Sequence, residues 1–314
     1  MADWPPLSVV VETSTWKVNG HIQLRDTLQA LKQQTYPASR LEIIVVIPPE
    51  HRERWEQMVS DMPDVAVVDA PPGRSYYQLK MRGLARARGD IVAFLDADTW
   101  VVPDWVREMA RPLLEDNRVG AVHGRHRFRI SFLSRMWDAV WWPRAYRPEG
   151  PIDRLSGANN VAFRRAFLER HFYDDPNPHR GVWERVMTAR IRGSGRLIWL
   201  NPRAVFIHDY HPSLAYFVRL ALARGYHLLA SRLQSPRAGE RFLTVVPWFA
   251  PWIVFPGLVV KDTWRILSLT PRLGLRRWEL WKVPFYALAY LLIEPVVLAG
   301  MVLAAAARPA PRLP

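Results

Sequence analysis

Apolar runs and helical patterns alternate over the first two hundred residues. Two helices are predicted: Ile22–Gln34 places its leucines near one helical face, and Tyr76–Arg88 is a helical segment that Gly89 stops. Short apolar runs that are typical of strands lie at Leu7–Val11, Leu41–Ile47 and Val65–Val68. Strands that alternate with helices predict an α/β fold with a mostly parallel sheet flanked by helices.

The next apolar run, IVAFL at residues 91–95, is predicted to be a strand buried on both faces of this sheet. Two acids, Asp96 and Asp98, follow it at once. In open α/β sheets, ligands bind beyond the carboxyl ends of the strands. The sequence therefore places two carboxylates where a ligand is expected.

Two long apolar stretches lie near the C-terminus, at Phe242–Val260 and Val283–Ala307. The second is long enough to cross a bilayer, for which about 20 apolar residues suffice. The first contains three prolines, each of which removes a helix hydrogen bond and favours a kinked, re-entrant or interfacial course. We therefore expect an α/β domain over residues 1–230 and membrane-associated helices over residues 231–314.

The formal net charge of +14 indicates an anionic partner. From Pro212 onward Arg and Lys outnumber Asp and Glu by 13 to 4, so the basic charge belongs mainly to the C-terminal region. The loop between the two apolar stretches is rich in Arg and Lys, and such loops normally stay on the cytoplasmic side. A monotopic or re-entrant hairpin is the preferred expectation, and two spanning helices are the alternative.

Composition also argues against several function classes. The chain has no cysteine, which excludes disulfides, thiolate catalysis and cysteine zinc sites. The start MADWPPLSVV shows no secretory signal, so the α/β domain is expected on the cytoplasmic face of the cell membrane. The sequence shows no zinc-ligand spacing, RNP-type strand or basic recognition helix, so nucleic acid is not an expected partner.

The two acids after the strand have two interpretations from the residues alone. Aspartate is common at strand ends and helix starts, so a capping or loop role is the simpler one. The alternative is a divalent cation that bridges Asp96, Asp98 and a diphosphate, because its charge offsets the repulsion between carboxylates and phosphates.

The wider context of these acids resembles the family 2 glycosyltransferases. Five blocks occur in that family's order between about Leu7 and Arg224: an N-terminal strand with Thr13, the span RGLARARGDIVAFLDADTWVVPDW, the segment SGANNVAFRR, a downstream acidic site, and PRAVFIH. The resemblance implies the GT-A fold and a metal-dependent, inverting transfer of a sugar from a nucleotide-diphospho-sugar.

The resemblance implies a metal site made by three residues. Asp98 is the expected ligand of a divalent metal, Mg or Mn, and Asp96 is the expected contact to the ribose or the metal. His208 ends the apolar run AVFIH and matches a family position near the diphosphate and the metal. Without the resemblance, a histidine after a strand is more often a packed or surface residue.

Further contacts to the nucleotide sugar follow from the same resemblance. Thr13 belongs to the N-terminal block, and Lys80 and Arg82 lie in the helix on the phosphate side, where solvated basic residues are the commoner case. The segment expected to shape the junction of donor and acceptor contains Gly157, Ala158, Asn159 and Asn160. A tight turn before a helix at 164–170 is the structural alternative for this segment, and both interpretations can hold.

The chain departs from the family after the second predicted strand. An Asp that recognises the nucleotide base is usual there, whereas this chain has VVIPPEH. Glu12, which stands where a proline is common, and Glu50 are candidate replacements. A UDP-sugar is the expected donor, and a GDP-sugar is the alternative.

The acidic site downstream contains the candidate catalytic base. In VWERVMTARI, Met187 and Arg190 set the register of the family's motif, so Glu184 falls on the base position and Trp183 replaces the usual first acid. Trp183 could stack against a sugar ring or lipid. The alternative for Glu184 is an exposed helical acid near Arg180, which contributes little energy.

Two acceptor types and one non-catalytic function remain open. A hydroxyl acceptor needs Glu184 to take its proton, whereas a lipid or polyprenyl phosphate is already ionised at neutral pH and needs no base. The basic, tryptophan-rich C-terminal region favours a lipid-linked or saccharide acceptor at a membrane. The alternative is a catalytically inactive module that binds nucleotide sugars within a membrane complex.

Overall fold

The computed structural model describes residues 4–14, 24–49, 52–59, 61–128, 147–172, 182–208, 214–234, 236, 238–269 and 277–307. The predicted helix start at Ile22, the candidate base contact Glu50 and Arg180 lie outside these ranges. The described chain divides into two compact units. Of the described residues, the unit that holds the sheet comprises those within 4–128, 147–172 and 186–208, and the unit that holds the C-terminal helices comprises 182–185 and those within 214–307.

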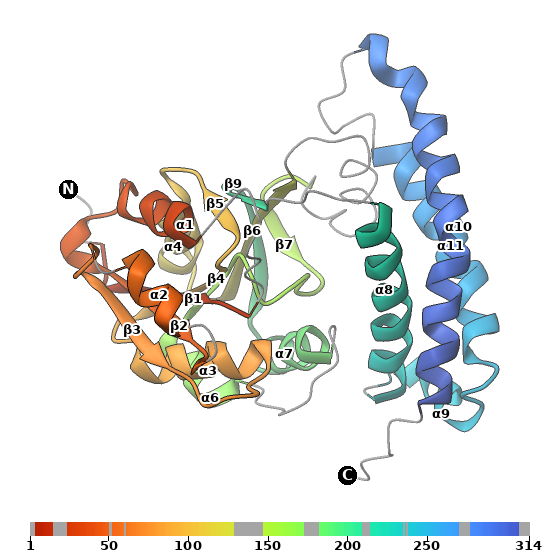
Figure 1. The fold of residues 1–314 in the computed structure, drawn as a ribbon, viewed down its shortest axis with the longest axis horizontal. Coiled ribbons are helices and arrows are strands. Elements are labelled where there is room, and N and C mark those ends of the chain that lie inside the picture. The colour runs from red at the N-terminus through yellow and green to blue at the C-terminus, as the bar shows by residue number, and fades with distance from the viewer. Residues whose placement is uncertain are drawn as a thin grey trace. The chain divides into compact units, whose positions relative to one another are not determined.

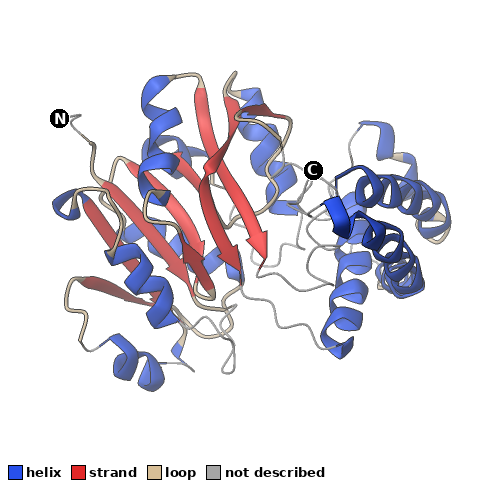
Figure 2. Cartoon of the chain, turned by 90° about the horizontal axis from the view of Figure 1, so that it is seen from above, coloured by secondary structure: helices blue, strands red, loops and turns tan. Residues whose placement is uncertain are grey.

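The N-terminal half of the sheet is parallel, as the apolar runs predict. Its neighbouring strands are β3 (Val65–Asp69), β2 (Leu41–Ile47), β1 (Leu7–Glu12) and β4 (Ile91–Asp96). Every residue of β1 and β4 is buried, because helices cover the sheet (Figures 1 and 2). The continuous apolar runs of these two strands are therefore explained by burial on both faces.

The second half makes the sheet mixed. β8 (Val161–Arg164) pairs antiparallel with β4 and with β6 (Val119–Phe128), and β6 runs parallel to β9 (Leu197–His208). Two short strands, β5 (Thr99–Val101) and β7 (Gly150–Ile152), pair antiparallel with β9. Among the described residues this gives nine strands in one sheet.

The helices of the sheet unit follow the predicted alternation. α3 packs on β1 and β2, α1 packs near β5, and α4 packs on β6 and β9. Their bounds are α1 Leu24–Lys32, α2 Arg52–Val59, α3 Tyr76–Arg86, α4 Trp105–Glu115, α6 Arg165–His171 and α7 Val182–Gly193, of which only the part from Val186 onward belongs to this unit. The short η1 (Ala38–Arg40) precedes β2.

The α3 helix is defined by its N-terminal cap and ends earlier than predicted. Ser75 and Gln78 form a reciprocal capping box, in which the hydroxyl of Ser75 accepts from the Gln78 amide and the Gln78 side chain accepts from the Ser75 amide. The prediction that Gly89 stops this helix is wrong, since the helix ends at Arg86. Gly89 is instead required by close approach, because a Cβ there would lie 2.5 Å from the backbone nitrogen of Ser8.

The C-terminal unit is helical. It contains α8 (Leu214–Gln234), α9 (Phe242–Val245), α10 (Ala250–Leu269) and α11 (Val283–Ala306), with the short η4 (Ala238–Glu240) and η6 (Arg277–Lys282). Within the described residues, Leu280–Ala306 is the one helical stretch that is long and apolar enough to cross a membrane by length and composition. α10 continues through Pro256. The predicted functional division near residue 230 stays a prediction.

Candidate active site

Strand pairing brings Asp98 and His208 together. Asp96 is the last residue of β4, and β5 begins at Thr99 after a turn of two residues. Thr99 pairs with His208 in the antiparallel register of β5 with β9. The Nε2 atom of His208 consequently lies 3.4 Å from Oδ1 of Asp98.

Hydroxyl groups fix the turn that carries Asp98. The Thr27 hydroxyl lies 2.8 Å from the carbonyl oxygen of Ala97 and 2.6 Å from that of Thr99, and it donates to these oxygens. The Thr99 hydroxyl donates to the carbonyl oxygen of Asp96 at 2.7 Å. The alternative interpretation of Asp98 as a helix cap is not supported, because α4 begins after Asp104.

Asp96, Asp98 and His208 form a compact group suited to a cation. One ligand atom from each lies within 4.8 Å of the others, and all three side chains are buried. Oxygen ligands suit Mg and Mn, and imidazole is a common ligand of transition metals. The donor set therefore fits a divalent ion, because two buried carboxylates so close together would otherwise repel each other.

Three side chains hold Asp96 in place. The Tyr76 hydroxyl and the Lys80 ammonium donate to Oδ1 at 2.8 and 3.0 Å, and the Asn159 side-chain amide donates to Oδ2 at 2.9 Å. Lys80 is fully buried and lies 4.4 Å above the centre of the Tyr76 ring. Lys80 is therefore the counter-ion of Asp96, a contact that the sequence did not predict.

The electrostatics keep Asp96 ionised. Burial opposes its ionisation, but the positive charge of Lys80, the neighbouring His208 and the Tyr76 hydrogen bond together hold the pKa of Asp96 below its ordinary value. Burial and the nearby charge of Asp96 raise the pKa of Tyr76 well above its ordinary value, so its hydroxyl stays a donor. The group at the end of β4 is thus an anionic carboxylate surrounded by donors.

A buried histidine near this group escaped the sequence analysis. His126 on β6 lies with its ring centre 5.9 Å from that of His208 and packs edge-on against Phe206. Burial, with His208 and His123 nearby, holds the pKa of His126 well below its ordinary value. The imidazole is therefore neutral at neutral pH and adds no positive charge beside His208. Its polar sequence context, HGRHRF, gave no signal of this burial.

The end of β1 places Glu12 and Thr13 beside the same strand end. Glu12 pairs in register with Asp96, and its Oε2 accepts from the amide and hydroxyl of Ser14 at 2.9 and 2.6 Å. The Thr13 hydroxyl donates to the carbonyl oxygen of Val46 at 2.8 Å. Both side chains are buried, and their roles toward a nucleotide stay predictions.

The segment Gly157–Asn160 combines a contact to the acids with a structural turn. Asn159 bonds Asp96, whereas Asn160 is fully buried with a φ of 53° in the left-handed region. Asn160 Oδ1 accepts from the Trp105 indole at 2.7 Å, and its backbone carbonyl accepts from the Gly124 amide. Gly157 and Ala158 are buried beside them. Asn159 faces the site, and Asn160 shapes the backbone.

Comparison with known proteins decides the family. Residues 22–174 match the model described as glycosyl transferase family 2, a range that contains Asp96, Asp98 and Asn159. The chain carries a glycosyl transferase family 2 domain over these residues.

Relatives of this glycosyltransferase agree in family and fold. It is 25% identical over 253 residues to the glucosyl-dolichyl phosphate glucuronosyltransferase of Haloferax volcanii, covering 74% of this chain and 80% of that one. It resembles the mannosyltransferase PcManGT of Pyrobaculum calidifontis, solved with GDP-Man and Mn²⁺, with a TM-score of 0.59, 20% identity and coverage of 97% and 88%. GalNAc-T7, solved with UDP, GalNAc and Mn²⁺, matches with a TM-score of 0.54, 15% identity and coverage of 76% and 52%. The predicted GT-A fold is confirmed.

The remaining predicted residues of the glycosyltransferase lie on helices. Arg82 is exposed on α3, two residues after the buried Lys80 and on a different face of the helix. Glu184 lies in the first turn of α7 and is partly exposed. The expectation that Trp183 could stack on a sugar or lipid is wrong, because its side chain is fully buried.

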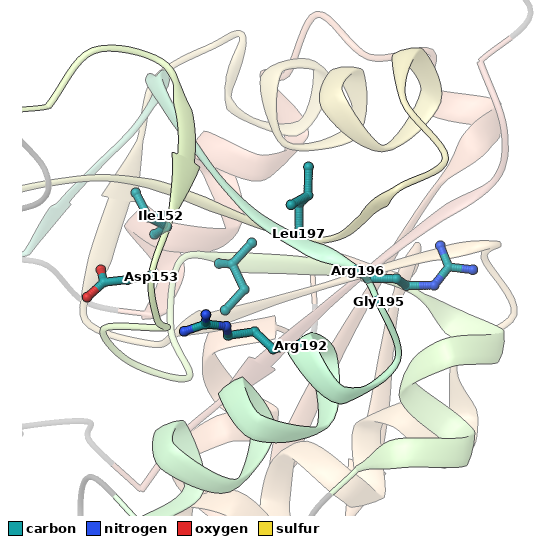
Figure 3. Close-up of a pocket in the computed structure, with 7 residues that line it drawn as sticks. Ile152, Asp153, Arg192, Gly195, Arg196 and Leu197 are labelled. Carbon is teal, nitrogen blue, oxygen red and sulfur yellow. The ribbon is translucent and has the colours of Figure 1, made fainter.

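A shallow pocket in the sheet unit lies away from the acids. Its volume is about 320 Å³, and it is formed where β7, the end of α7 and the start of β9 meet (Figure 3). Leu197 and Ile198, which line it, are at the opposite end of β9 from His208. This pocket is therefore not the site that the acids form.

Proposed function

We propose that this glycosyltransferase transfers a sugar, with inversion, from a nucleotide-diphospho-sugar to a lipid-linked or saccharide acceptor at the cytoplasmic face of the cell membrane. The observation that carries the proposal is the buried group of Asp96, Asp98 and His208 at adjacent strand ends. Such a transfer would serve the synthesis of a cell-envelope polysaccharide or a glycolipid.

The acid group would hold a divalent metal, Mg or Mn. Asp98 and His208 present Oδ1 and Nε2 close together, while Asp96 has both oxygens engaged by Tyr76, Lys80 and Asn159. We therefore assign Asp98 and His208 as direct ligands, and Asp96 as a ligand or ribose contact held rigidly by its three donors. When bound, the metal supplies the positive charge that offsets the leaving diphosphate.

The donor is a nucleotide-diphospho-sugar whose base and sugar stay open. The two solved neighbours bind GDP-Man or UDP with GalNAc, so both guanosine and uridine donors fit this fold. We keep the UDP-sugar as the first expectation and the GDP-sugar as the alternative. Glu12 and Thr13, at the end of β1, and Ala158 and Asn159, before β8, are the proposed donor contacts together with Gly157.

A lipid-linked acceptor is supported by the relative and by the helical unit. The Haloferax volcanii relative is named for a glycosylated dolichyl phosphate. The exposed aromatic side chains of the helical unit include Trp248, Trp252, Trp264 and Trp281, and its longest apolar helix is long enough to cross a membrane. Exposed tryptophans are typical of membrane interfaces. Together these observations favour a membrane-bound acceptor.

Glu184 is the proposed base for a hydroxyl acceptor. It would take the proton as the acceptor oxygen attacks the anomeric carbon from the face opposite the diphosphate. If the acceptor is instead a phosphate, which is ionised at neutral pH, Glu184 need only position it. The assignment rests on the family register of VWERVMTARI, in which Glu184 occupies the base position.

The test is a panel of UDP- and GDP-sugars with Mn or Mg, on detergent-solubilised full-length protein with membrane lipid extract as acceptor. The proposal predicts metal-dependent binding and release of the nucleotide. Glu184→Gln should abolish transfer to a hydroxyl acceptor and preserve donor binding, with Glu169→Gln, an exposed acid on α6, as the control. Binding without release, with any acceptor, would instead favour the inactive binding module.

A further inference from the structure

A charged cluster in the helical unit lies outside the site described above. Asp262 of α10 is fully buried, and its carboxylate is shared by cations from two helices. Arg224 of α8 donates to Oδ2, Arg265 donates to Oδ1 at 3.0 Å, and Lys261 Nζ lies 3.6 Å from Oδ1. Tyr290 of α11 also donates to Oδ2, at 3.1 Å.

The cluster has more cations than acids. Its second acid is Glu294, in the middle of α11, which lies 3.5 Å from Arg224 and has 2% of its surface exposed. In the described part of this cluster, three cations therefore face two carboxylates. The surplus positive charge of this cluster attracts an anion.

The surplus positive charge lies on the more exposed cations of α10. Arg224 is buried, whereas the Lys261 side chain is 43% exposed and that of Arg265 is 24% exposed. Partial burial lowers the pKa of Lys261 to about 8, while Asp262 opposes this effect and Arg265, Arg224 and Arg232 add to it. Lys261 and Arg265 are therefore the cations of the cluster that an anion from outside can reach.

The surroundings of Lys261 are apolar and open. Val260 and Trp264 are 71% and 70% exposed, and Ile253, two turns before Val260, is exposed on the same face of α10, which we call the exposed stripe. Lys261 follows Val260 directly and borders this stripe with a charge. A ligand that matches both features has an anionic group joined to hydrocarbon.

We propose that Lys261 and Arg265 bind the phosphate head group of a membrane lipid, whose hydrocarbon lies along the exposed stripe of α10. The head group supplies the anion that the cluster lacks, and a lysine that reaches from an apolar helix face to a lipid phosphate is a common arrangement at membranes. This inference rests on the proposed membrane attachment and deepens it, but it does not require sugar transfer.

The experiment measures lipid binding by native mass spectrometry of the full-length protein in detergent micelles. The micelles contain a polyprenyl monophosphate, phosphatidic acid or the neutral polyprenol. Wild type should prefer both phosphate lipids over the polyprenol. Lys261→Gln and Arg265→Gln should each weaken that binding roughly fivefold, the effect of about 1 kcal/mol per charge. Lys261→Arg should retain it.

The control is Arg219→Gln, which removes an exposed charge from α8 in the same unit and should leave lipid binding unchanged. Equal losses in Arg219→Gln and Lys261→Gln would overturn the site, as would equal binding by Lys261→Gln and wild type. If inorganic phosphate displaced the bound lipid as effectively as a phosphate lipid does, the site would bind phosphate alone and the proposal of a lipid ligand would be overturned. Tighter binding of the polyprenyl phosphate than of phosphatidic acid would identify the site's ligand as an acceptor-type lipid.

Metal-dependent donor binding, measured on the same preparations, separates this inference from the proposed function. If wild type binds the donor but shows no preference for phosphate lipids, only the lipid site is contradicted. If wild type prefers phosphate lipids but does not bind the donor, only the proposed function is contradicted.

Discussion

Lys80 Nζ lies 3.0 Å from Oδ1 of Asp96, and both side chains are buried. Removing one partner of a buried ion pair leaves an uncompensated charge, which costs about 3–5 kcal/mol. Lys80→Met should therefore lower the free energy of unfolding by roughly that amount and weaken metal-dependent donor binding. Chemical unfolding and donor titration measure the two effects.

Arg82→Met is the matched control for Lys80→Met, since Arg82 lies on the same helix and is exposed. It should change stability by less than about 0.5 kcal/mol, as exposed substitutions usually do. If both variants lose the same stability, Lys80 is not the specific counter-ion of Asp96.

Substitutions of the neighbours Asn159 and Asn160 should affect different properties, metal binding for the first and stability for the second. Asn159→Ala removes a donor from Asp96 and should weaken metal affinity roughly 10–100-fold, as the loss of an outer hydrogen bond to a ligand does. Asn160→Ala removes the bond to the Trp105 indole and the residue best suited to its left-handed backbone, so it should mainly lower the melting temperature. Metal titration and thermal unfolding of both variants test this, and the reverse pattern would contradict it.

Tyr36 should make the stability of the sheet unit depend on alkaline pH. Burial raises its pKa to about 12, and its hydroxyl donates to the carbonyl oxygen of Pro5. A raised folded-state pKa means that the folded chain binds more protons between the two values. The contribution of Tyr36 to the free energy of unfolding is thus fully present below about pH 10, the pKa of tyrosine in the unfolded chain. It is lost as the pH rises toward about 12, the pKa in the folded chain.

Tyr36→Phe keeps the ring that packs against Trp4 and removes the ionisable group. The stability difference between wild type and Tyr36→Phe should therefore shrink between pH 10 and 12. Urea unfolding across that range measures it, and a constant difference would refute the assignment.

Two glycines allow α8 and α11 to pack closely. A Cβ at Gly225 would lie 1.9 Å from the carbonyl oxygen of Val297, and one at Gly300 would lie 2.1 Å from that of Leu222. Close packing through small residues is common between helices in membranes. Gly225→Ala should therefore destabilise the helical unit by about 1–3 kcal/mol, the usual cost of overpacking.

The control for that change is Gly257→Ala on α10, where an added Cβ meets nothing within 4 Å. Alanine there should raise stability, because glycine weakens a helix by about 1 kcal/mol relative to alanine. Thermal unfolding in detergent compares the two variants. A stabilising Gly225→Ala would show that the helices are farther apart than the structure has them.

The sequence predicted the parallel half of the sheet well because its strands are continuous apolar runs. β2 has the predicted bounds, and β4 ends at the predicted acid. β6 escaped prediction because its second half, HGRHRF, is polar, although His123 and His126 are buried there. Whether such a polar stretch forms a buried strand depends on its partners in other elements and not on its local periodicity.

The family resemblance predicted which residues surround the acids but not how they contact one another. Asp96, Asp98 and His208 do come together. Lys80 was expected to assist a diphosphate, and its hydrogen bond to Asp96 was not predicted. Tyr76, the first residue of α3, was not expected to contact the site, yet its hydroxyl also donates to Asp96. Both contacts arise because α3 packs against β1 beside β4, a long-range arrangement that spacing along the chain does not encode.

The most direct test of the account is calorimetric titration of Mn²⁺, alone and with nucleotide sugar, into wild type, Asp98→Ala and Asp64→Ala. Asp64 is an exposed acid paired with Lys32 and serves as the control. Asp98→Ala should weaken Mn²⁺ binding by at least about 100-fold and abolish metal-dependent donor binding. Loss of a residue that only hydrogen-bonds to a metal ligand already lowers metal affinity about 10–100-fold. Asp64→Ala should match wild type. Unchanged Mn²⁺ and donor binding in Asp98→Ala would contradict a metal held by these acids.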